Sequence, residues 1–247
     1  MINNFKSQFN HAPLVVKNII LINVMMFLLS VVLEFKHIDL NRILGLYYIE
    51  SANFNPFQIV THMFMHGGFT HILFNMYALW MFGQVLERVW GSKRFFVFYF
   101  VTGLGAAFLH MITMGIEFYL IQSQMPSQLV QEVVQQGSTI FAAGKNYTDL
   151  SMSELNILLN TPTVGASGAV FGVLLGFGML FPNTQLMLLI PPMPIKAKYF
   201  VMIYGAIELY LGFTRTGGNV AHFAHIGGML FGYFLIIYWN RNRSKFY

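Results

Sequence analysis

The chain has 247 residues, of which 56% are hydrophobic and 9% are charged, against roughly a quarter charged in an average soluble domain. This composition is typical of a protein that has lipid as its solvent. The net charge of +5 does not indicate a nucleic-acid partner, because the basic residues lie in short clusters beside apolar runs. The absence of cysteine excludes a disulfide framework, a thiolate nucleophile and a thiolate metal site.

Six segments approach the roughly 20 apolar residues that a membrane-spanning helix needs. They predict an all-α polytopic membrane protein that forms a single domain over residues 1–247. The N-terminal segment has no A-x-A-like cleavage site, so we expect it to remain as the first span. The predicted spans are 14–34, 68–86, 95–116, 165–181, 198–213 and 220–239.

Two connections are long enough to carry structure of their own. We expect residues 35–64 to fold as a loop at the membrane interface, and residues 117–163 to form a hydrated, partly helical insert between the third and fourth spans. Ser151 and Glu154 have the spacing of a capping box, which predicts that a short helix starts there. The prolines of FPNTQLMLLIPPMPIKAK are expected to break any helix between the fourth and fifth spans.

The basic residues predict that both termini face the cytoplasm, because cytoplasmic segments are enriched in Lys and Arg. With six spans and both ends inside, ten of the fourteen basic residues fall on cytoplasmic segments. These ten are Lys6, Lys17, Arg88, Lys93, Arg94, Lys196, Lys198, Arg241, Arg243 and Lys245.

Under this topology, spans two, four and six all begin at the outer face, and each carries polar residues there. Polar groups at membrane depth are costly unless they are paired or line a wet cavity. A cluster gathered from three helices therefore predicts a functional site. Its members are His66, His71, Asn75, Ser167, His222 and His225.

Ser167 lies in TVGASGAVFG, at the predicted start of the fourth span. Gly165 and Gly168 leave room for a substrate backbone, and the free N–H groups of a helix's first turn favour a developing oxyanion. The alternative is a packing face, since Gly168, Gly172 and Gly176 form a small-xxx-small series.

His225 lies in AHFAHIGGMLFG, followed by Gly228 and Gly232 at four-residue spacing. Glycine faces on the fourth and sixth spans would let these helices approach closely enough for a hydrogen bond between Ser167 and His225. A lone histidine here would be an ordinary polar residue at a helix end. Phe171, one turn after Ser167, could stack on the His225 ring, or could simply pack in the core.

His71 and Asn75 are four residues apart and share a helical face. Their N–H donors could stabilise the oxyanion of a tetrahedral intermediate. His62 and His66 have the same spacing, which suggests zinc. Metal is the weaker hypothesis, because there is no HExxH motif, no cysteine and no carboxylate in this cluster. We predict neither a metal nor another cofactor.

Three motifs, in order along the chain, resemble those of the rhomboid intramembrane serine proteases. HMFMHGGFTHILFN resembles the second-helix motif, in which two histidines and an asparagine follow at spacings of five and four, here His66, His71 and Asn75. GASG resembles the serine motif. AHFAHIGGMLFG resembles the last-helix motif, whose histidine precedes glycines at plus three and plus seven, which selects His225 over His222.

The resemblance covers most of residues 57–238. It implies a serine endopeptidase with a Ser167–His225 dyad and an oxyanion hole made by Asn75, His71 and the backbone N–H of Ser167. His66, Gly165, Phe171, Gly228 and Gly232 would support this site. The implied substrates are membrane-anchored proteins cut near the outer face, and the implied location is a bacterial inner membrane.

Two features depart from the family's pattern. Phe57 and Gln58 stand where many relatives have a Trp-Arg pair, which would change the lipid contacts and orientation of the first loop. The 47-residue insert, 117–163, is longer than in minimal members. Glu87 matches a family position for which we expect a structural role.

The glycines that follow the predicted fifth span suggest a hypothesis about mechanism. We expect a substrate helix to enter between spans two and five, under a flexible cap formed by GFTRTGG at residues 212–218. Because a dyad lacks an acid, its base should be weaker than that of a full triad, and turnover should be slow.

Two alternatives remain open at this point. The first is a catalytically inactive relative that binds transmembrane helices, against which the presence of both Ser167 and His225 argues. The second is a transporter with His66, His71 and Glu208 as a proton or metal relay.

Overall fold

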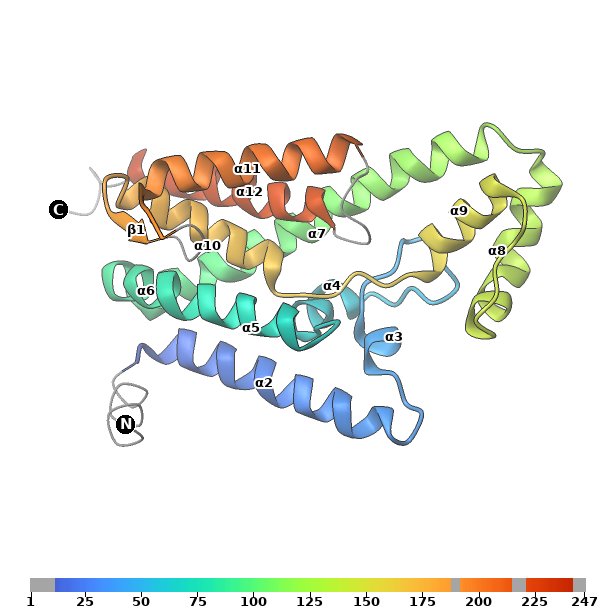
Figure 1. The fold of residues 1–247 in the computed structure, drawn as a ribbon, viewed down its shortest axis with the longest axis horizontal. Helices are drawn as coiled ribbons and strands as arrows, with labels where there is room; N and C mark the ends of the chain where they lie inside the picture. The colour runs from blue at the N-terminus through green and yellow to red at the C-terminus, as the bar shows by residue number, and fades with distance from the viewer. Residues whose placement is uncertain (1–11, 188–191, 215–220, 242–247) are drawn as a thin grey trace.

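The computed structural model describes residues 12–187, 192–214 and 221–241, and shows a bundle of long helices with a helical extension at one end (Figure 1). The elements in chain order are α2 (Leu14–Glu34), α3 (Leu40–Leu44), α4 (Gln58–Thr61), η1 (His62–Phe64), α5 (Phe69–Ala78), η2 (Leu79–Gly83), α6 (Gln84–Trp90), α7 (Ser92–Gln122), α8 (Ser127–Ala142), α9 (Leu150–Asn160), α10 (Ser167–Leu180), β1 (Gln185–Met187), β2 (Pro194–Lys196), α11 (Ala197–Thr214) and α12 (His222–Arg241).

The prediction of a helical membrane protein is confirmed. Within the described residues, three helices are long and apolar enough to cross a bilayer: α2, α7 and α12. Helix α10 is apolar but has only 14 residues. The full count of six spans therefore remains a prediction.

Helices α7, α10 and α12 pack together as the centre of the bundle. Glycines allow this close approach: a Cβ atom on Gly228 of α12 would overlap the carbonyl group of Gly168 on α10. One turn further on, a Cβ on Gly232 would lie 3.5 Å from the Cα of Gly172. The small-residue faces predicted on these two helices therefore meet each other.

Helix α2 lies at the edge of the bundle and is attached at its N-terminus by a buried carboxylate. The backbone N–H groups of Val15 and Val16 donate to Glu87 at 2.9 and 2.8 Å, and the hydroxyl of Ser92 donates to it at 2.6 Å. A carboxylate here satisfies first-turn N–H groups and complements the helix dipole. The structural role predicted for Glu87 is confirmed by these contacts.

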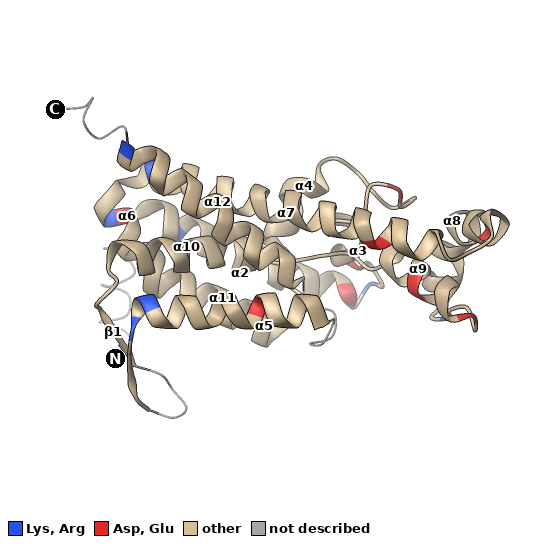
Figure 2. Cartoon of the chain, turned by 90° about the horizontal axis from the view of Figure 1, so that it is seen from above, with Lys and Arg blue, Asp and Glu red and all other residues tan. Residues whose placement is uncertain are grey.

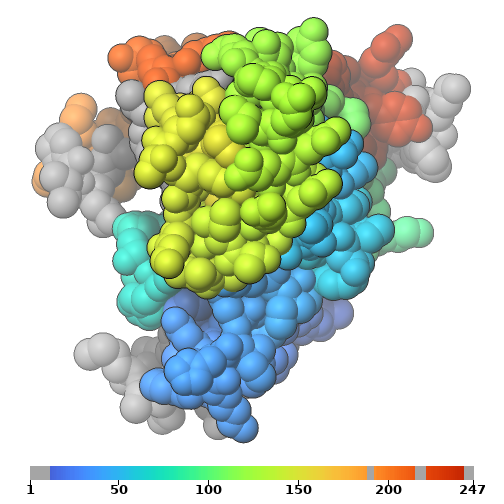
Figure 3. Space-filling model, turned by 90° about the vertical axis from the view of Figure 1, so that its right-hand side faces the viewer, coloured from blue at the N-terminus to red at the C-terminus, as the bar shows by residue number. Residues whose placement is uncertain are grey.

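The extension consists of the C-terminal part of α7 with α8 and α9, which together cover one end of the molecule (Figure 3). Helix α7 has 31 residues, so it is about 46 Å long and exceeds the roughly 30 Å hydrocarbon core of a bilayer. The extension has its own apolar cluster, into which Tyr48 of the loop between α3 and α4 also packs. The members from the extension are Met114, Ile121, Val133, Met152, Leu155, Leu158 and Leu159.

The predicted helix start within residues 117–163 was placed two residues too late. Helix α9 begins at Leu150, because the side chain of Asp149 accepts a hydrogen bond from the N–H of Met152 and caps the helix. Asp149, rather than Ser151, is the N-cap residue.

Two further local features were not predicted. Residues 185–187 and 194–196, in the proline-containing connection, pair as an antiparallel two-stranded ribbon. The second predicted span is helical from Phe69 to Trp90. It consists of α5, the π-helical turn η2 and α6, which follow one another without a break.

Lys and Arg predominate at one end of the bundle and Asp and Glu at the other (Figure 2), although Glu87 lies on α6 at the basic end and Arg42 on α3 at the acidic end. Lys and Arg gather at the end that holds α6, β1 and the C-terminal end of α12, whereas Asp and Glu gather around α3, α8 and α9. This segregation supports the predicted orientation, with the basic end in the cytoplasm, which remains a prediction.

Candidate active site

Ser167 is the first residue of α10, at the point where an extended segment turns into the helix. Leu46 and Thr163 hold that segment by exchanging two backbone hydrogen bonds, at 2.9 and 2.8 Å. The N–H of Gly165 donates to the carbonyl of His62 at 2.9 Å, and Gly165 has a φ of +135°, which L side chains rarely adopt. These contacts fix the backbone just before Ser167 and so orient its side chain.

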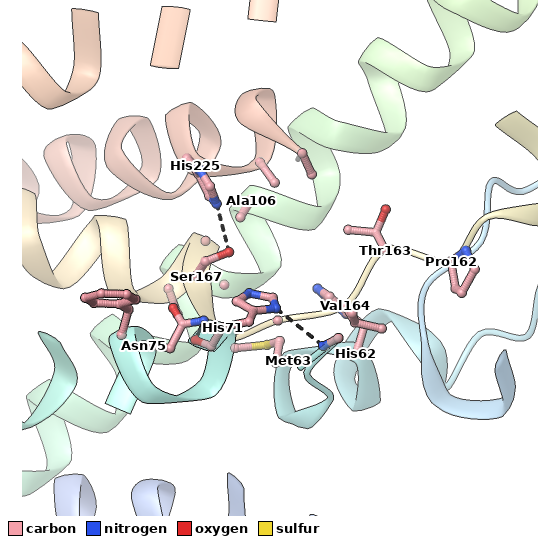
Figure 4. Close-up of a pocket in the computed structure, with 18 of the residues that line it drawn as sticks. His62, Met63, His71, Asn75, Ala106, Pro162, Thr163, Val164, Ser167 and His225 are labelled. Atoms are coloured by element: carbon pink, nitrogen blue, oxygen red, sulfur yellow. Dashed lines mark hydrogen bonds between the residues drawn. The ribbon is translucent and has the colours of Figure 1, made fainter. Parts of the chain in front are cut away.

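The Ser167 hydroxyl faces His225 of α12. The distance between Ser167 Oγ and His225 Nε2 is 2.8 Å (Figure 4). The glycine contacts between α10 and α12 bring the two side chains this close. This is the geometry in which a histidine can take the proton of an attacking serine.

The imidazole of His225 is held on its face by Phe171, one turn after Ser167 on α10. The two rings stack with centroids 4.1 Å apart and an interplanar angle of 6°. His225 is also buried, with 8% of its surface exposed. The ring therefore has little freedom to turn away from Ser167.

The expectation that this histidine has no carboxylate partner was wrong. Glu208 of α11 lies with its Oε2 2.9 Å from His225 Nδ1 and 2.6 Å from His222 Nδ1. The transporter alternative places Glu208 with His66 and His71, but its short contacts are with His222 and His225. The sequence of these two helices does not reveal which face of α11 packs against His225 of α12.

His71 and Asn75 lie on α5, on the other side of Ser167 from His225 (Figure 4). His71 Nδ1 accepts a hydrogen bond from the N–H of Gly67 at 3.4 Å, which leaves the ring proton on Nε2. The Asn75 amide donates to the His71 carbonyl at 3.1 Å and has a second N–H group. A Cβ on Gly165 would approach His71 Nε2 to 2.8 Å, so glycine makes room for this ring.

His62 and His66 do not form the paired face that would suggest zinc. His62 begins the short helix η1, whereas His66 lies beyond its end in the stretch before α5. Both side chains are buried. His62 Nδ1 pairs with the Gln58 carbonyl at 2.8 Å.

His66 supports His71 by ring packing. Their centroids are 5.1 Å apart, with an interplanar angle of 68°. His66 is 2% exposed, and within the described part of the chain neither of its ring nitrogens has a hydrogen-bond partner.

A cavity of ≈ 700 Å³ opens between these elements. Its lining includes Ser167, His225, His71 and Asn75. Its walls come from α5, α7, α10, α12 and residues 161–165. A polar contact that the sequence analysis missed stiffens one wall: His110 of α7 pairs with the Thr163 hydroxyl at 2.7 Å. A cavity of this size can admit an extended peptide segment of a few residues.

The predicted cap, residues 212–218, lies largely outside the described residues. The structure describes Gly212 to Thr214, which form the end of α11, and describes the chain again from residue 221. Entry of a substrate between spans two and five remains a prediction.

Comparison with known proteins identifies one family. A family model of the rhomboid domain matches residues 53–242. The chain is 25% identical over 175 residues to "Rhomboid protein 1, mitochondrial" of Saccharomyces cerevisiae, a match that covers 71% of this chain and 39% of that protein. It is 25% identical over 177 residues to the rhomboid protease GluP of Bacillus subtilis, covering 72% of this chain and 25% of GluP.

A third relative is the rhomboid protease AarA of Providencia stuartii, 25% identical over 176 residues, with 69% of this chain and 51% of AarA covered. The matched regions therefore span about half or less of the lengths of these relatives. Two of the three are named as proteases.

Proposed function

The chain belongs to the rhomboid family, and on that premise we propose that it is a serine endopeptidase that cleaves membrane-anchored proteins within the bilayer. The observation that carries the proposal is the 2.8 Å separation of Ser167 Oγ and His225 Nε2 at the wall of the cavity. An apolar side chain could fill the space of either residue. Polar groups at membrane depth are costly, which favours a functional reason for the pair.

The first chemical step is attack of the Ser167 hydroxyl on the carbonyl carbon of the scissile peptide. As the new C–O bond forms, His225 Nε2 takes the hydroxyl proton. The negative charge moves to the carbonyl oxygen, where the Nε2–H of His71, the free amide N–H of Asn75 and the first-turn N–H of Ser167 are the candidate donors.

Collapse of this intermediate breaks the C–N bond, and His225 gives its proton to the departing amine. The remaining acyl-enzyme is hydrolysed by a water molecule, which His225 deprotonates in turn. Water must therefore reach the cavity, and the polar groups of His71, Asn75 and His225 on its walls favour hydration.

The proposed substrates are proteins whose spanning segment can unwind, since a peptide bond inside a helix is shielded by its own hydrogen bonds. The proposed location is a bacterial inner membrane with the site near the outer face. The basic residues at the opposite end of the bundle support the placement of the site near the outer face.

The test is Ser167→Ala in a membrane that contains a membrane-anchored reporter. We expect cleavage to disappear while the protein remains folded and still binds the reporter. Ser123→Ala, which removes an exposed hydroxyl at the end of α7, is the control and should cleave as the wild type does. Wild-type protein that binds the reporter and never cuts it would instead identify an inactive helix-binding relative.

A further inference from the structure

Glu208 is a buried carboxylate within a helix of the bundle, and such groups are costly unless they are paired. Among the described residues, the other buried acid is Glu87, whose oxygens accept the N–H groups of α2. The ion-pair contacts of Glu208 are instead with two imidazoles. One of these belongs to His225, which the proposed function requires as its base.

The contact between Glu208 and the two histidines uses a single oxygen. Glu208 Oε2 lies 2.6 Å from His222 Nδ1, in hydrogen-bonding geometry, and 2.9 Å from His225 Nδ1. At His225 the distance is short, but the ring N–H is not aligned with the oxygen, so the carboxylate faces the Nδ1 side of the ring without a well-formed hydrogen bond. His222 therefore anchors the carboxylate, and the anchored carboxylate faces His225.

This arrangement selects a tautomer of His225. An ionised carboxylate only accepts hydrogen bonds, and a neutral imidazole carries its proton on one of its two nitrogens. With Glu208 beside Nδ1, the proton belongs on Nδ1, because a lone pair there would face the negative oxygen. Nε2 then has its lone pair free toward Ser167, whose hydroxyl donates across 2.8 Å.

Among the residues that the structure describes, three further imidazoles lie near His225. His222 lies on the same helix, His71 lies on α5 and His110 on α7, each near enough to interact electrostatically or by ring contact. When His225 becomes an imidazolium, Glu208 is the group among these that supplies an opposite charge. Stabilising that cation lowers the barrier to removing the serine proton.

A metal ion held by Glu208, His222 and His225 is the competing interpretation, since the three ligand atoms lie within 4.8 Å of one another. Two ligands of one tetrahedral zinc ion are about 3.3 Å apart, given zinc–ligand bonds of about 2.0 to 2.1 Å. The separations of 2.6 and 2.9 Å are shorter than that. They correspond to an imidazole Nδ1 in direct contact with a carboxylate oxygen.

We propose that Glu208 is a positioning residue for His225, so that the site works as a Ser167–His225–Glu208 triad with His222 holding the acid. The proposal rests on the proposed function and deepens it. It also replaces the expectation of a dyad without an acid.

The test is steady-state cleavage of a membrane-anchored reporter by Glu208→Gln, which keeps the size of the side chain and removes its charge. We expect kcat to fall at least about tenfold, and by up to about 10⁴, the effect of the same acid-to-amide change in soluble serine protease triads. KM should stay within about twofold, because the lost interaction is made in the transition state.

Two further variants make the result specific. Glu208→Asp keeps the charge at a shorter reach and should recover part of the lost kcat, and it also replaces Glu208→Gln if that variant does not fold. Glu154→Gln makes the same chemical change at an exposed position on α9 and should leave kcat and KM unchanged.

Three results would overturn the proposal. One is wild-type kcat in folded Glu208→Gln. Another is equal inactivity of Glu208→Gln and Glu208→Asp with a matching loss of thermal stability, which indicates a structural role. The third is full kcat in Glu208→Gln together with loss of a zinc inhibition that the wild type shows, which indicates a metal site. A wild type without Ser167-dependent cleavage would instead refute the proposed function itself.

Discussion

At the scale of single residues, the site is a histidine ring restrained on three sides. Phe171 stacks on its face, Ser167 meets Nε2 and Glu208 lies beside Nδ1. The motifs around Ser167 and His225 could be read from the sequence because their glycines recur at helical spacing. Glu208 could not be assigned to His225 in this way, since it lies 17 residues earlier on another helix and its facing depends on how α11 packs.

The stacked ring of Phe171 leads to a prediction at this scale. An aromatic contact is worth about 0.5 to 1.5 kcal/mol beyond its buried area, which corresponds to roughly a 2- to 13-fold change in rate if the contact acts on the orientation of His225. We expect Phe171→Leu to lower kcat by about that factor in the reporter assay, and Phe171→Tyr to retain activity.

The control for this prediction is Phe234→Leu, because Phe234 on α12 is 60% exposed and lies away from the site. It should cleave at the wild-type rate. Equal activity of Phe171→Leu and wild type would show that packing elsewhere is sufficient to orient His225.

At the scale of elements, the sequence predicted helices better than it predicted their ends and connections. The first span, 14–34, coincides with α2, because its apolar run ends in polar residues on both sides. The start of α9 was predicted too late because Asp149, and not Ser151, is the N-cap residue of the helix. The ribbon at 185–187 and 194–196 was missed because strands of three residues carry almost no periodic pattern.

The glycine contact between α10 and α12 gives a prediction at this scale. A valine side chain at Gly228 would collide with the backbone of Gly168 and push the helices apart. We expect Gly228→Val to destabilise the protein by about 1 to 3 kcal/mol or more, measured as unfolding in detergent by heat or denaturant. Cleavage should fall as well, since Ser167 and His225 would separate.

Gly205→Ala is the matched control, because its new Cβ would meet only the flexible end of Met229, at 3.2 and 3.5 Å. Alanine also favours the helix over glycine by roughly 1 kcal/mol, so stability should be kept or slightly raised. Wild-type stability in Gly228→Val would contradict the account of how these helices pack.

At the scale of the whole molecule, the fold brings residues from three separate helices together in the lining of one cavity. Ser167 comes from α10, the proposed base His225 from α12 and the proposed oxyanion donors His71 and Asn75 from α5. Composition and charge predicted a helical membrane protein and a basic end opposite an acidic one. They could not predict the depth of the cavity or the acid beside the base, because both depend on packing between distant segments.

The most direct measurement of the central claim is covalent labelling of the folded protein in membranes by a serine-reactive fluorophosphonate, with the labelled peptide identified by mass spectrometry. The account predicts a label on Ser167 and a labelling rate that falls by about 10² to 10⁴ in His225→Ala, the contribution expected of a general base. An unlabelled wild type, a label on another serine, or an unchanged rate in His225→Ala would contradict it.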